Sequence, residues 1–405
     1  MAFKPTTHPV GPSGPLRWLH EVLDAHRHTG LERLLSATSA GEEVGPPGRL
    51  ALRGNKSLLN FSSNDYLGLS KHHSLCEAAI AAIEAHGWGA GSARLICGHH
   101  PLHEQLERRL ALFKRRQAAL VYPSGYATNL GVISALMGDD DLIFLDKLNH
   151  ASLIDGARLS GASVRIYPHN GLSRLEHLLQ RLRVGHQKCL IVSDTVFSME
   201  GDLADLPALS EMAQRFDAML MVDEAHATGI WGDNGRGMAE HQGVEDHVDI
   251  VVGTLSKALG GVGGYVAGSQ ELIDYLINFS RPFMYTTGSP AAAAAAGCAA
   301  LDVVAREPHR RQRLVDCANR VRQQLCADGW NIGNSATQII PLVVGSPEHA
   351  LALARHLENR GILAVAIRPP SVPPAASRLR LSISCQHSDQ DFARLYDALR
   401  EVSLR

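Results

Sequence analysis

Short runs of apolar residues recur through the middle of the chain, and each is followed by polar or glycine residues and then by a helical pattern. The runs lie at residues 118–125, 141–152, 190–198, 218–227 and 249–261. Runs that are apolar at consecutive positions are typical of strands buried on both faces of a sheet. Because these runs alternate with helices, the pattern predicts an α/β protein whose large domain has a mostly parallel central sheet.

Polar residues end each of these apolar runs. They are Ser124-Gly125, Asn149-His150, Ser198, the segment 223–226, and Ser256-Lys257. In parallel α/β sheets, ligands bind outside the carboxyl ends of the strands. We therefore expect these residues to converge on one edge of the sheet and to form a single site.

The pattern changes near both ends of the chain. Residues 16–40 have an amphipathic helical pattern, followed by a Gly/Pro break at 45–48. After about residue 290, helical patterns at 306–328, 347–360 and 388–402 alternate with strand-like runs at 338–344 and 378–384. We expect an N-terminal tail and helix over residues 1–60, a large domain over 61–295 and a C-terminal α/β domain over 296–405.

Composition narrows the class of protein. The 405 residues include 39 Lys and Arg against 41 Asp and Glu, and a net charge of −2 gives no reason to expect nucleic-acid or anionic-membrane binding. The 7 cysteines include no CxxC pair, so neither a disulfide framework nor a zinc site is expected. Residues 1–15 lack the apolar segment of a signal peptide, and the small-residue stretch 291–300 is too short to span a bilayer. These features predict a cytoplasmic protein.

A group of histidines at positions 99, 100 and 103 is the one cluster that raises the question of a metal. Pro101 suits the first turn of a helix, which would direct these side chains to different faces. A zinc site needs three or four converging ligands. We therefore expect no metal.

Asp223 ends a buried strand and stands three residues before His226. A buried carboxylate is costly unless it has a partner, and a cationic ring nitrogen would provide one. Pyridoxal phosphate (PLP) has such a nitrogen, and its protonated ring is the better electron sink. The alternatives are a buried ion pair with an arginine, or the DExH motif of a helicase. The helicase alternative is disfavoured because no GxxxxGK[ST] loop precedes the motif.

Lys257 leaves an apolar strand and enters a glycine-rich turn. Desolvation lowers the pKa of a lysine and leaves a nucleophilic amine, suited to a Schiff base with PLP. A lysine that extends to the surface is the alternative.

Gly125 and Tyr126 follow another strand and open a helix. Free backbone N–H groups at the start of this helix would bind the cofactor phosphate. The alternative is that Ser124 is only a helix cap. His150 would stack on the ring, or serve as a structural hydrogen-bonding residue.

Four further motifs make the resemblance to a family specific. They are Phe61 to Leu69 (FSSNDYLGL), Asn149 to Ser152 (NHAS), Phe197 to Asp202 (FSMEGD) and Val222 to Gly229 (VDEAHATG). Together with Asp223 and Lys257 they resemble the α-oxoamine synthases, which are fold-type I PLP enzymes. Members of this family condense an amino acid with an acyl thioester and release carbon dioxide. The resemblance covers roughly residues 20–400.

The resemblance also implies roles for individual residues. Lys257 would carry PLP and act as the base, Asp223 would pair with the ring nitrogen, and His226 and Ser198 would contact the ring hydroxyl, while His150 would stack on the ring. Gly125, Tyr126 and Thr254 would hold the phosphate, and Thr287 would reach it from the partner subunit, which implies a homodimer. Arg368 would bind the substrate carboxylate, with Arg33 and Asn64 as further substrate-binding residues.

The segments 366–373 and 377–380 are most similar to the members of this family that act in biotin synthesis. This implies L-alanine and a pimeloyl thioester, carried on CoA or on a carrier protein, as the substrates. Arg94 lies in the glycine-rich segment 87–98, where other synthases of this type can carry different residues. This difference bears on which acyl donor the protein recognises. The alternatives are another α-oxoamine synthase and a non-catalytic scaffold subunit of the same family. The presence of both Lys257 and Asp223 argues against the scaffold.

Overall fold

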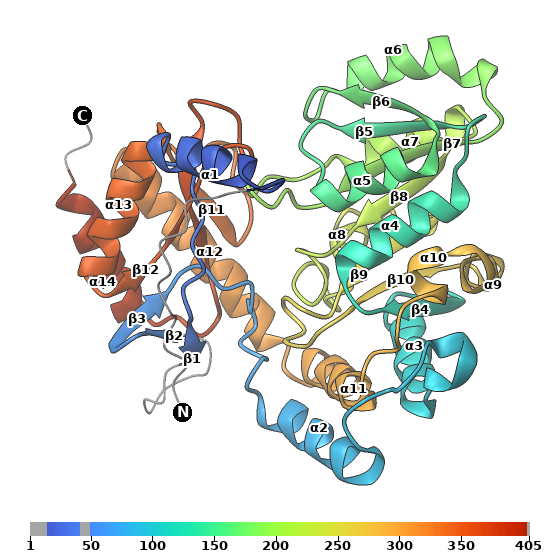
Figure 1. Ribbon diagram of the computed structural model, residues 1–405, viewed down its shortest axis with the longest axis horizontal. Helices are drawn as coiled ribbons and strands as arrows, with labels where there is room; N and C mark the ends of the chain where they lie inside the picture. Colours follow the sequence, from blue (N-terminus) through green and yellow to red (C-terminus); the bar gives the residue numbers. More distant parts are fainter. Residues whose placement is uncertain (1–13, 41–48, 403–405) are drawn as a thin grey trace.

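The computed structural model describes residues 14–40 and 49–402. Figure 1 shows two regions side by side, a large region built on one sheet and a smaller region in which N-terminal elements (blue) lie among C-terminal elements (red). Within the described residues, no helix is long and apolar enough to cross a membrane.

The large region is built on a seven-stranded sheet in which only β10 runs against its neighbours β4 and β9. In spatial order the strands are β4 (Ala118–Tyr122), β10 (Gly264–Gly268), β9 (Ile250–Thr254), β8 (Met219–Asp223), β7 (Cys189–Asp194), β5 (Leu142–Asp146) and β6 (Ser163–Tyr167). The five apolar runs of the sequence correspond to β4, β5, β7, β8 and β9. The prediction of an α/β fold with a mostly parallel sheet is confirmed.

Both faces of this sheet are buried. Leu142 and Phe144 of β5 belong to one hydrophobic cluster, and Ile143 and Leu145 of the same strand belong to another. Helices pack around this sheet and on one another: α2 (His73–His86), α3 (Pro101–Phe113), α4 (Gly125–Leu136), α5 (Ala151–Ser160), α6 (Leu172–Leu182), α7 (Leu206–Arg215), α8 (Met238–His241), α9 (Gln270–Phe279), α10 (Arg281–Met284) and α11 (Ala291–Arg306). Short helical turns lie at η1 (Arg94–Gly98), η2 (Arg183–Gly185) and η3 (Glu245–His247). This burial explains why the strands are apolar at consecutive positions.

The smaller region combines both ends of the chain. It contains α12 (His309–Ala327), β11 (Ile339–Gly345), α13 (Pro347–Asn359), β12 (Ile362–Leu363), β13 (Val365–Ile367), β14 (Ser377–Ser382) and α14 (Asp389–Arg400), with α1 (Trp18–His28), β1 (Ser39–Ala40), β2 (Leu50–Arg53) and β3 (Lys56–Asn60). One sheet has the order β11-β14-β13 and the other β1-β2-β3-β12. Strand β3 pairs in parallel with β12, so the N-terminal segment and the C-terminal region share a sheet.

The N-terminal helix is shorter than the sequence pattern suggests. The prediction of a helix over residues 16–40 is wrong beyond His28, where α1 ends. Gly30 follows with a φ of +66°, a left-handed conformation that stops a right-handed helix. The residues after it form an irregular segment that contacts the C-terminal region through Arg368.

His169 joins the end of β5 to the segment after β7. Its Nδ1 lies 3.0 Å from Asp146 and its Nε2 lies 2.7 Å from Asp202. Burial alone would lower the pKa of His169, but the two carboxylates outweigh it and raise the pKa to about 10. Because this pKa is higher in the folded chain than in the unfolded chain, the protonated imidazole stabilises the fold below pH ~6.5. That contribution disappears as the pH rises through about 10.

We expect His169→Gln to lower the free energy of unfolding at pH 6 by about 1–2 kcal/mol, a figure reduced for the partial exposure of the ring. The difference from the wild type should shrink as the pH approaches 10. Urea unfolding at pH 6, 8 and 10 measures it, with His177→Gln on α6 as the control. A difference that is the same at all three pH values would contradict this account.

Candidate active site

The polar residues that end the strands converge at the carboxyl edge of the seven-stranded sheet. Asp194 at the end of β7 and Asp223 at the end of β8 are paired across the two strands. Asp223 is in turn opposite Val252 of β9, the strand that leads to Lys257. The sheet therefore places residues distant in sequence beside one another, as its strand order requires.

Lys257 and His226 are in direct contact, with 2.9 Å between Nζ and Nε2. Burial, against the opposing effect of Asp223, lowers the pKa of Lys257 to about 8. Burial, together with the charge of Lys257, lowers the pKa of His226 well below its usual value. The hydroxyl of Tyr66 lies 2.8 Å from the other ring nitrogen of His226. The site thus holds a readily deprotonated amine beside a neutral imidazole.

Asp223 is 5% exposed, and its carboxylate accepts hydrogen bonds from Asn129 Nδ2 at 2.7 Å and from the backbone N–H of Ala225 at 2.8 Å. In the part of the chain that the structure describes, it forms no ion pair. A buried carboxylate without a cationic partner fits the protonated ring nitrogen of PLP. It does not fit the alternative of a buried ion pair with an arginine.

The N-terminus of α4 lies against the strand that leads to Lys257. A Cβ added to Gly264 would lie 2.6 Å from the Cα of Gly125, and one added to Gly125 would lie 3.5 Å from Thr254. Ser124 caps the helix by accepting the N–H of Ala127 at 3.1 Å. Glycines at 125 and 264 therefore allow the helix terminus to approach Thr254. Free N–H groups at such a terminus suit a phosphate.

His150 and Tyr126 are both near this terminus. His150 caps α5, and its ring centroid lies 6.5 Å from that of Tyr126. Burial lowers the pKa of His150, so its ring is neutral at physiological pH. The hydroxyl of Tyr126 donates a hydrogen bond to Asp155, which leaves the tyrosine ring beside the candidate phosphate site.

Arg380 is a site residue to which the sequence analysis assigned no role. It is 8% exposed, and it donates to Asn64 Oδ1 at 3.0 Å, to the Tyr66 hydroxyl at 3.1 Å and to the backbone carbonyl of Ser198. Its charge also contributes to the lowered pKa of Lys257. The signal in the sequence is the alternation of Arg378, Leu379 and Arg380 in a strand whose residues are all buried. Asn64 and Ser198 are thus joined to the site through Arg380.

The other predicted substrate-binding residues lie where the N-terminal segment meets the C-terminal region. Arg368 donates to the carbonyls of Gly30 and Glu32, and Arg33 Nη2 lies 3.4 Å from the carbonyl of Pro369. Thr287 is exposed and forms an isolated bridge with Ala93. These contacts do not connect the three residues to Lys257, and their predicted roles remain predictions.

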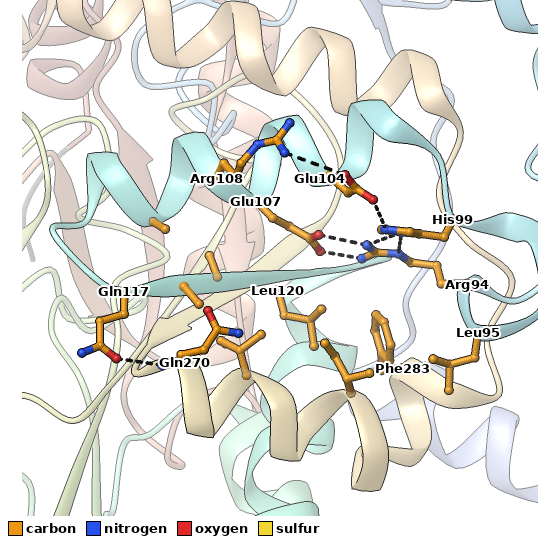
Figure 2. A pocket seen from close by; sticks show the side chains of 15 residues that line it. Arg94, Leu95, His99, Glu104, Glu107, Arg108, Gln117, Leu120, Gln270 and Phe283 are labelled. Atoms are coloured by element: carbon orange, nitrogen blue, oxygen red, sulfur yellow. Dashed lines mark hydrogen bonds and ion pairs between the residues drawn. The ribbon is translucent and has the colours of Figure 1, made fainter.

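Arg94 is buried and forms a bidentate ion pair with Glu107, with distances of 2.6 and 2.9 Å (Figure 2). It also donates to the carbonyl of Val121 at 3.2 Å, and Glu107 accepts the N–H of that residue at 2.8 Å. Figure 2 shows the pair beside a groove of about 400 Å³ between α3, β4 and α9, and this groove is lined by none of the predicted cofactor residues. Arg94 therefore stabilises the outer edge of β4.

The histidines at 99, 100 and 103 are used structurally. His100 caps α3, and His103 bonds the carbonyl of Ser289 at 2.8 Å. Across the described residues, no group of three or more His, Cys, Asp and Glu side chains is arranged to hold a metal ion.

Comparisons with known proteins show the family to which the chain belongs. The model of the aminotransferase class I and II family matches residues 56–399. The 8-amino-7-oxononanoate synthase of Geotalea daltonii is 46% identical over 384 residues, covering 94% of this chain and 96% of that relative. A serine palmitoyltransferase from S. paucimobilis, solved with PLP and myriocin bound, superimposes with a TM-score of 0.88 and 28% identity, covering 95% of this chain and 96% of that one. For the 8-amino-7-oxononanoate synthase from Francisella tularensis, the TM-score is 0.74, the identity 29% and the coverage 84% and 96%.

The fold and these comparisons define a PLP-dependent acyltransferase of fold type I, as the sequence predicted. Within that class, the chain belongs to the 8-amino-7-oxononanoate synthases of biotin biosynthesis, a branch of the α-oxoamine synthases.

The lowered pKa of Lys257 leads to a prediction about cofactor capture. Only the unprotonated amine attacks a carbonyl, so the rate at which the apoprotein captures PLP should rise about tenfold per pH unit below pH ~8 and then level off. Stopped-flow absorbance at pH 6 to 10 measures this rate, with free lysine as the control. A rate that keeps rising to pH 10, as for an ordinary lysine, would contradict the lowered pKa.

Proposed function

We propose that the protein joins L-alanine to a pimeloyl thioester at this site, and releases carbon dioxide and the free thiol carrier. The observation that carries this proposal is the contact between Lys257 and His226 beside the buried, unpaired carboxylate of Asp223. The relatives named 8-amino-7-oxononanoate synthase support this choice of substrates.

Bound PLP supplies a positively charged ring that withdraws electrons from the α-carbon of the amino acid. Lys257 removes and returns the proton at this carbon, since its amine is neutral above pH ~8 and partly neutral below it. Asp223 would keep the ring nitrogen charged, and His226 and Ser198 would contact the ring hydroxyl. His150 would cover one face of the ring.

The phosphate is proposed to bind at the N-terminus of α4. Gly125 and Tyr126 contribute N–H groups there, and Thr254 lies against the same turn. Thr287 contributes from the partner subunit. Because α4 begins at Gly125, which has no side chain, the phosphate can approach the backbone closely.

Arg380 and Asn64 are the proposed partners of the amino-acid carboxylate. Arg380 is buried, already orders Asn64 and Tyr66, and can offer a planar guanidinium to a carboxylate. Arg368 and Arg33, which lie where the N-terminal segment meets the C-terminal region, are proposed to bind a carboxylate of the substrates.

The reaction balances with one proton taken from water. The α-carbon loses a proton to Lys257 and bonds to the thioester carbonyl carbon, and the departing thiolate takes up a proton from solvent. The carboxylate of the resulting β-keto acid then leaves as carbon dioxide, and the proton held by Lys257 takes its place on the α-carbon. The product keeps the amine of alanine and the full acyl chain.

The proposed assembly is a homodimer. The bridge between Ala93 and Thr287 brings two segments together that expose Ile96 (80%) and Tyr285 (69%). Exposed apolar side chains of this kind on adjacent segments mark a protein interface. A native mass equal to one chain would contradict the homodimer.

The 7 cysteines are all free, which supports the proposed cytoplasmic location.

The substrates can be identified by measuring kcat/KM of the purified holoenzyme with different pairs of amino acid and acyl donor. We expect the kcat/KM for L-alanine with pimeloyl-CoA, or with a pimeloyl carrier protein, to exceed that for glycine with acetyl-CoA and for L-serine with palmitoyl-CoA. Comparison of the two pimeloyl donors then identifies the carrier. Faster turnover of glycine or serine would overturn the substrate assignment.

A further inference from the structure

A chain of buried hydrogen bonds joins Asp223 to His150. Asn129 Nδ2 donates to Asp223 Oδ2 at 2.7 Å and to Ser152 Oγ at 2.9 Å. Ser152 Oγ lies 2.7 Å from His150 Nδ1. The proposed partner of the ring nitrogen and the proposed ring-stacking residue are thus connected through the side chains of Asn129 and Ser152.

Both connecting residues are enclosed by protein. Asn129 of α4 is 1% exposed and Ser152 of α5 is 0% exposed. Their helices pack against each other. Any movement of one helix relative to the other would therefore change the position of Asn129 relative to Ser152, and with it the hydrogen bonds that connect Asp223 to His150.

The direction of each hydrogen bond follows from the donors and acceptors present. The two amide hydrogens of Asn129 serve Asp223 and Ser152, while its Oδ1 has no hydrogen-bond partner. Since Ser152 Oγ accepts from Asn129, its own hydrogen is available to His150 Nδ1, which also lies 3.3 Å from the N–H of Ser152. Nδ1 therefore accepts, and the proton of the neutral imidazole is on Nε2.

The backbone of His150 is held by a second carboxyl group. Its N–H donates to Asp194 Oδ2 at 2.8 Å, and Asp194 is the neighbour of Asp223 across β7 and β8. Burial and the charge of Asp223 raise the pKa of Asp194 well above its usual value. Several charged and titratable groups act on these residues through their electric fields: Asp146, Asp155, Asp194, Asp223, Glu224, His150, His226, Lys257 and Arg380.

We propose that Asn129 and Ser152 are positioning residues that fix the carboxylate of Asp223 and the ring of His150 relative to each other. This inference rests on the proposed function, because it assigns Asp223 to the ring nitrogen of PLP and His150 to its face. Without Asn129, the carboxylate loses a donor in a buried place and is free to turn. Without Ser152, the imidazole loses the partner that selects its tautomer.

A double-mutant cycle separates this role from a merely structural one. Asn129→Leu should lower kcat about 10- to 100-fold, and Ser152→Ala about 3- to 10-fold. In the Asp223→Asn background, Asn129→Leu should cost less than about threefold, because the carboxylate that it supports is already absent. Ser210→Ala is the control, because Ser210 is also buried and its hydroxyl donates to the carbonyl of Pro207. This variant should leave kcat unchanged in both backgrounds.

The absorbance of bound PLP provides a readout other than activity. The pH at which it changes should shift by about one unit in Asn129→Leu, in the same direction as in Asp223→Asn. Ser152→Ala removes one hydroxyl and should shift this pH by a smaller amount. It is the test variant if Asn129→Leu does not fold. An equal loss of kcat for Asn129→Leu in both backgrounds would overturn the inference. An Asp223→Asn variant with wild-type kcat and absorbance would instead overturn the proposed function.

Discussion

Lys257→Ala is expected to abolish covalent capture of PLP and to lower kcat by at least about a thousandfold. The substitution removes the amine that contacts His226 and whose pKa is lowered to about 8. Borohydride reduction followed by mass spectrometry should show PLP attached to the wild type and not to the variant. The kcat with L-alanine and pimeloyl-CoA measures the second effect.

Lys114→Met is the matched control for Lys257→Ala. Lys114 is also buried, and burial lowers its pKa, but it bonds Thr228 at 3.0 Å and the carbonyl of Arg236. Its loss should lower the melting temperature and leave PLP attachment intact. Attachment of PLP to another lysine with wild-type kcat in Lys257→Ala would show that Lys257 is not the anchor.

Asp223→Asn is expected to lower kcat by about a thousandfold while the protein keeps its fold. The substitution preserves size but removes the charge that holds the proton on the ring nitrogen, at a place where burial makes an electrostatic interaction strong. The absorbance of bound PLP as a function of pH should change with it. Steady-state kcat and the absorbance titration are the measurements.

Glu224→Gln tests whether the effect belongs to Asp223 or to any buried carboxylate nearby. Glu224 accepts the backbone N–H groups of Met238 and Ala239 at 2.8 and 2.9 Å and is 1% exposed. We expect this variant to lose thermal stability and to keep kcat within about tenfold of the wild type. Equal losses of kcat in the two variants would argue against a specific role for Asp223.

The sequence predicts the sheet well where strands are apolar on both faces, and poorly where glycine replaces apolar residues. Strands β4, β5, β7, β8 and β9 were predicted from consecutive apolar positions. Strand β10 was missed, since its sequence begins and ends with glycine and follows a glycine-rich turn. Gly264 is required there because any side chain would meet the N-terminus of α4. The same residue that hides the strand makes the candidate phosphate site accessible.

The sequence predicts those site residues that directly follow the strands, because the carboxyl ends of parallel strands lie at one edge of the sheet. The contact between His226 and Lys257 spans 31 residues, and sequence spacing alone cannot place two such atoms 2.9 Å apart. Arg380 was given no role because it meets Asn64 only after the C-terminal region folds back, across 316 residues. Arg94 was linked to acyl-donor recognition, and only the structure shows its ion pair with Glu107.

The pairing of β3 with β12 has a consequence for synthesis on the ribosome. Leu59 is opposite Ile362, so about 300 residues are made after β3 before its partner strand exists. At about 5–20 residues per second, this takes roughly 15–60 seconds, long enough for the seven-stranded sheet to form first. During that interval the edge of β3 that will pair with β12 is exposed to other nascent chains. Slower translation of the last hundred codons would lengthen the exposure, and more of the chain should then be recovered in aggregates.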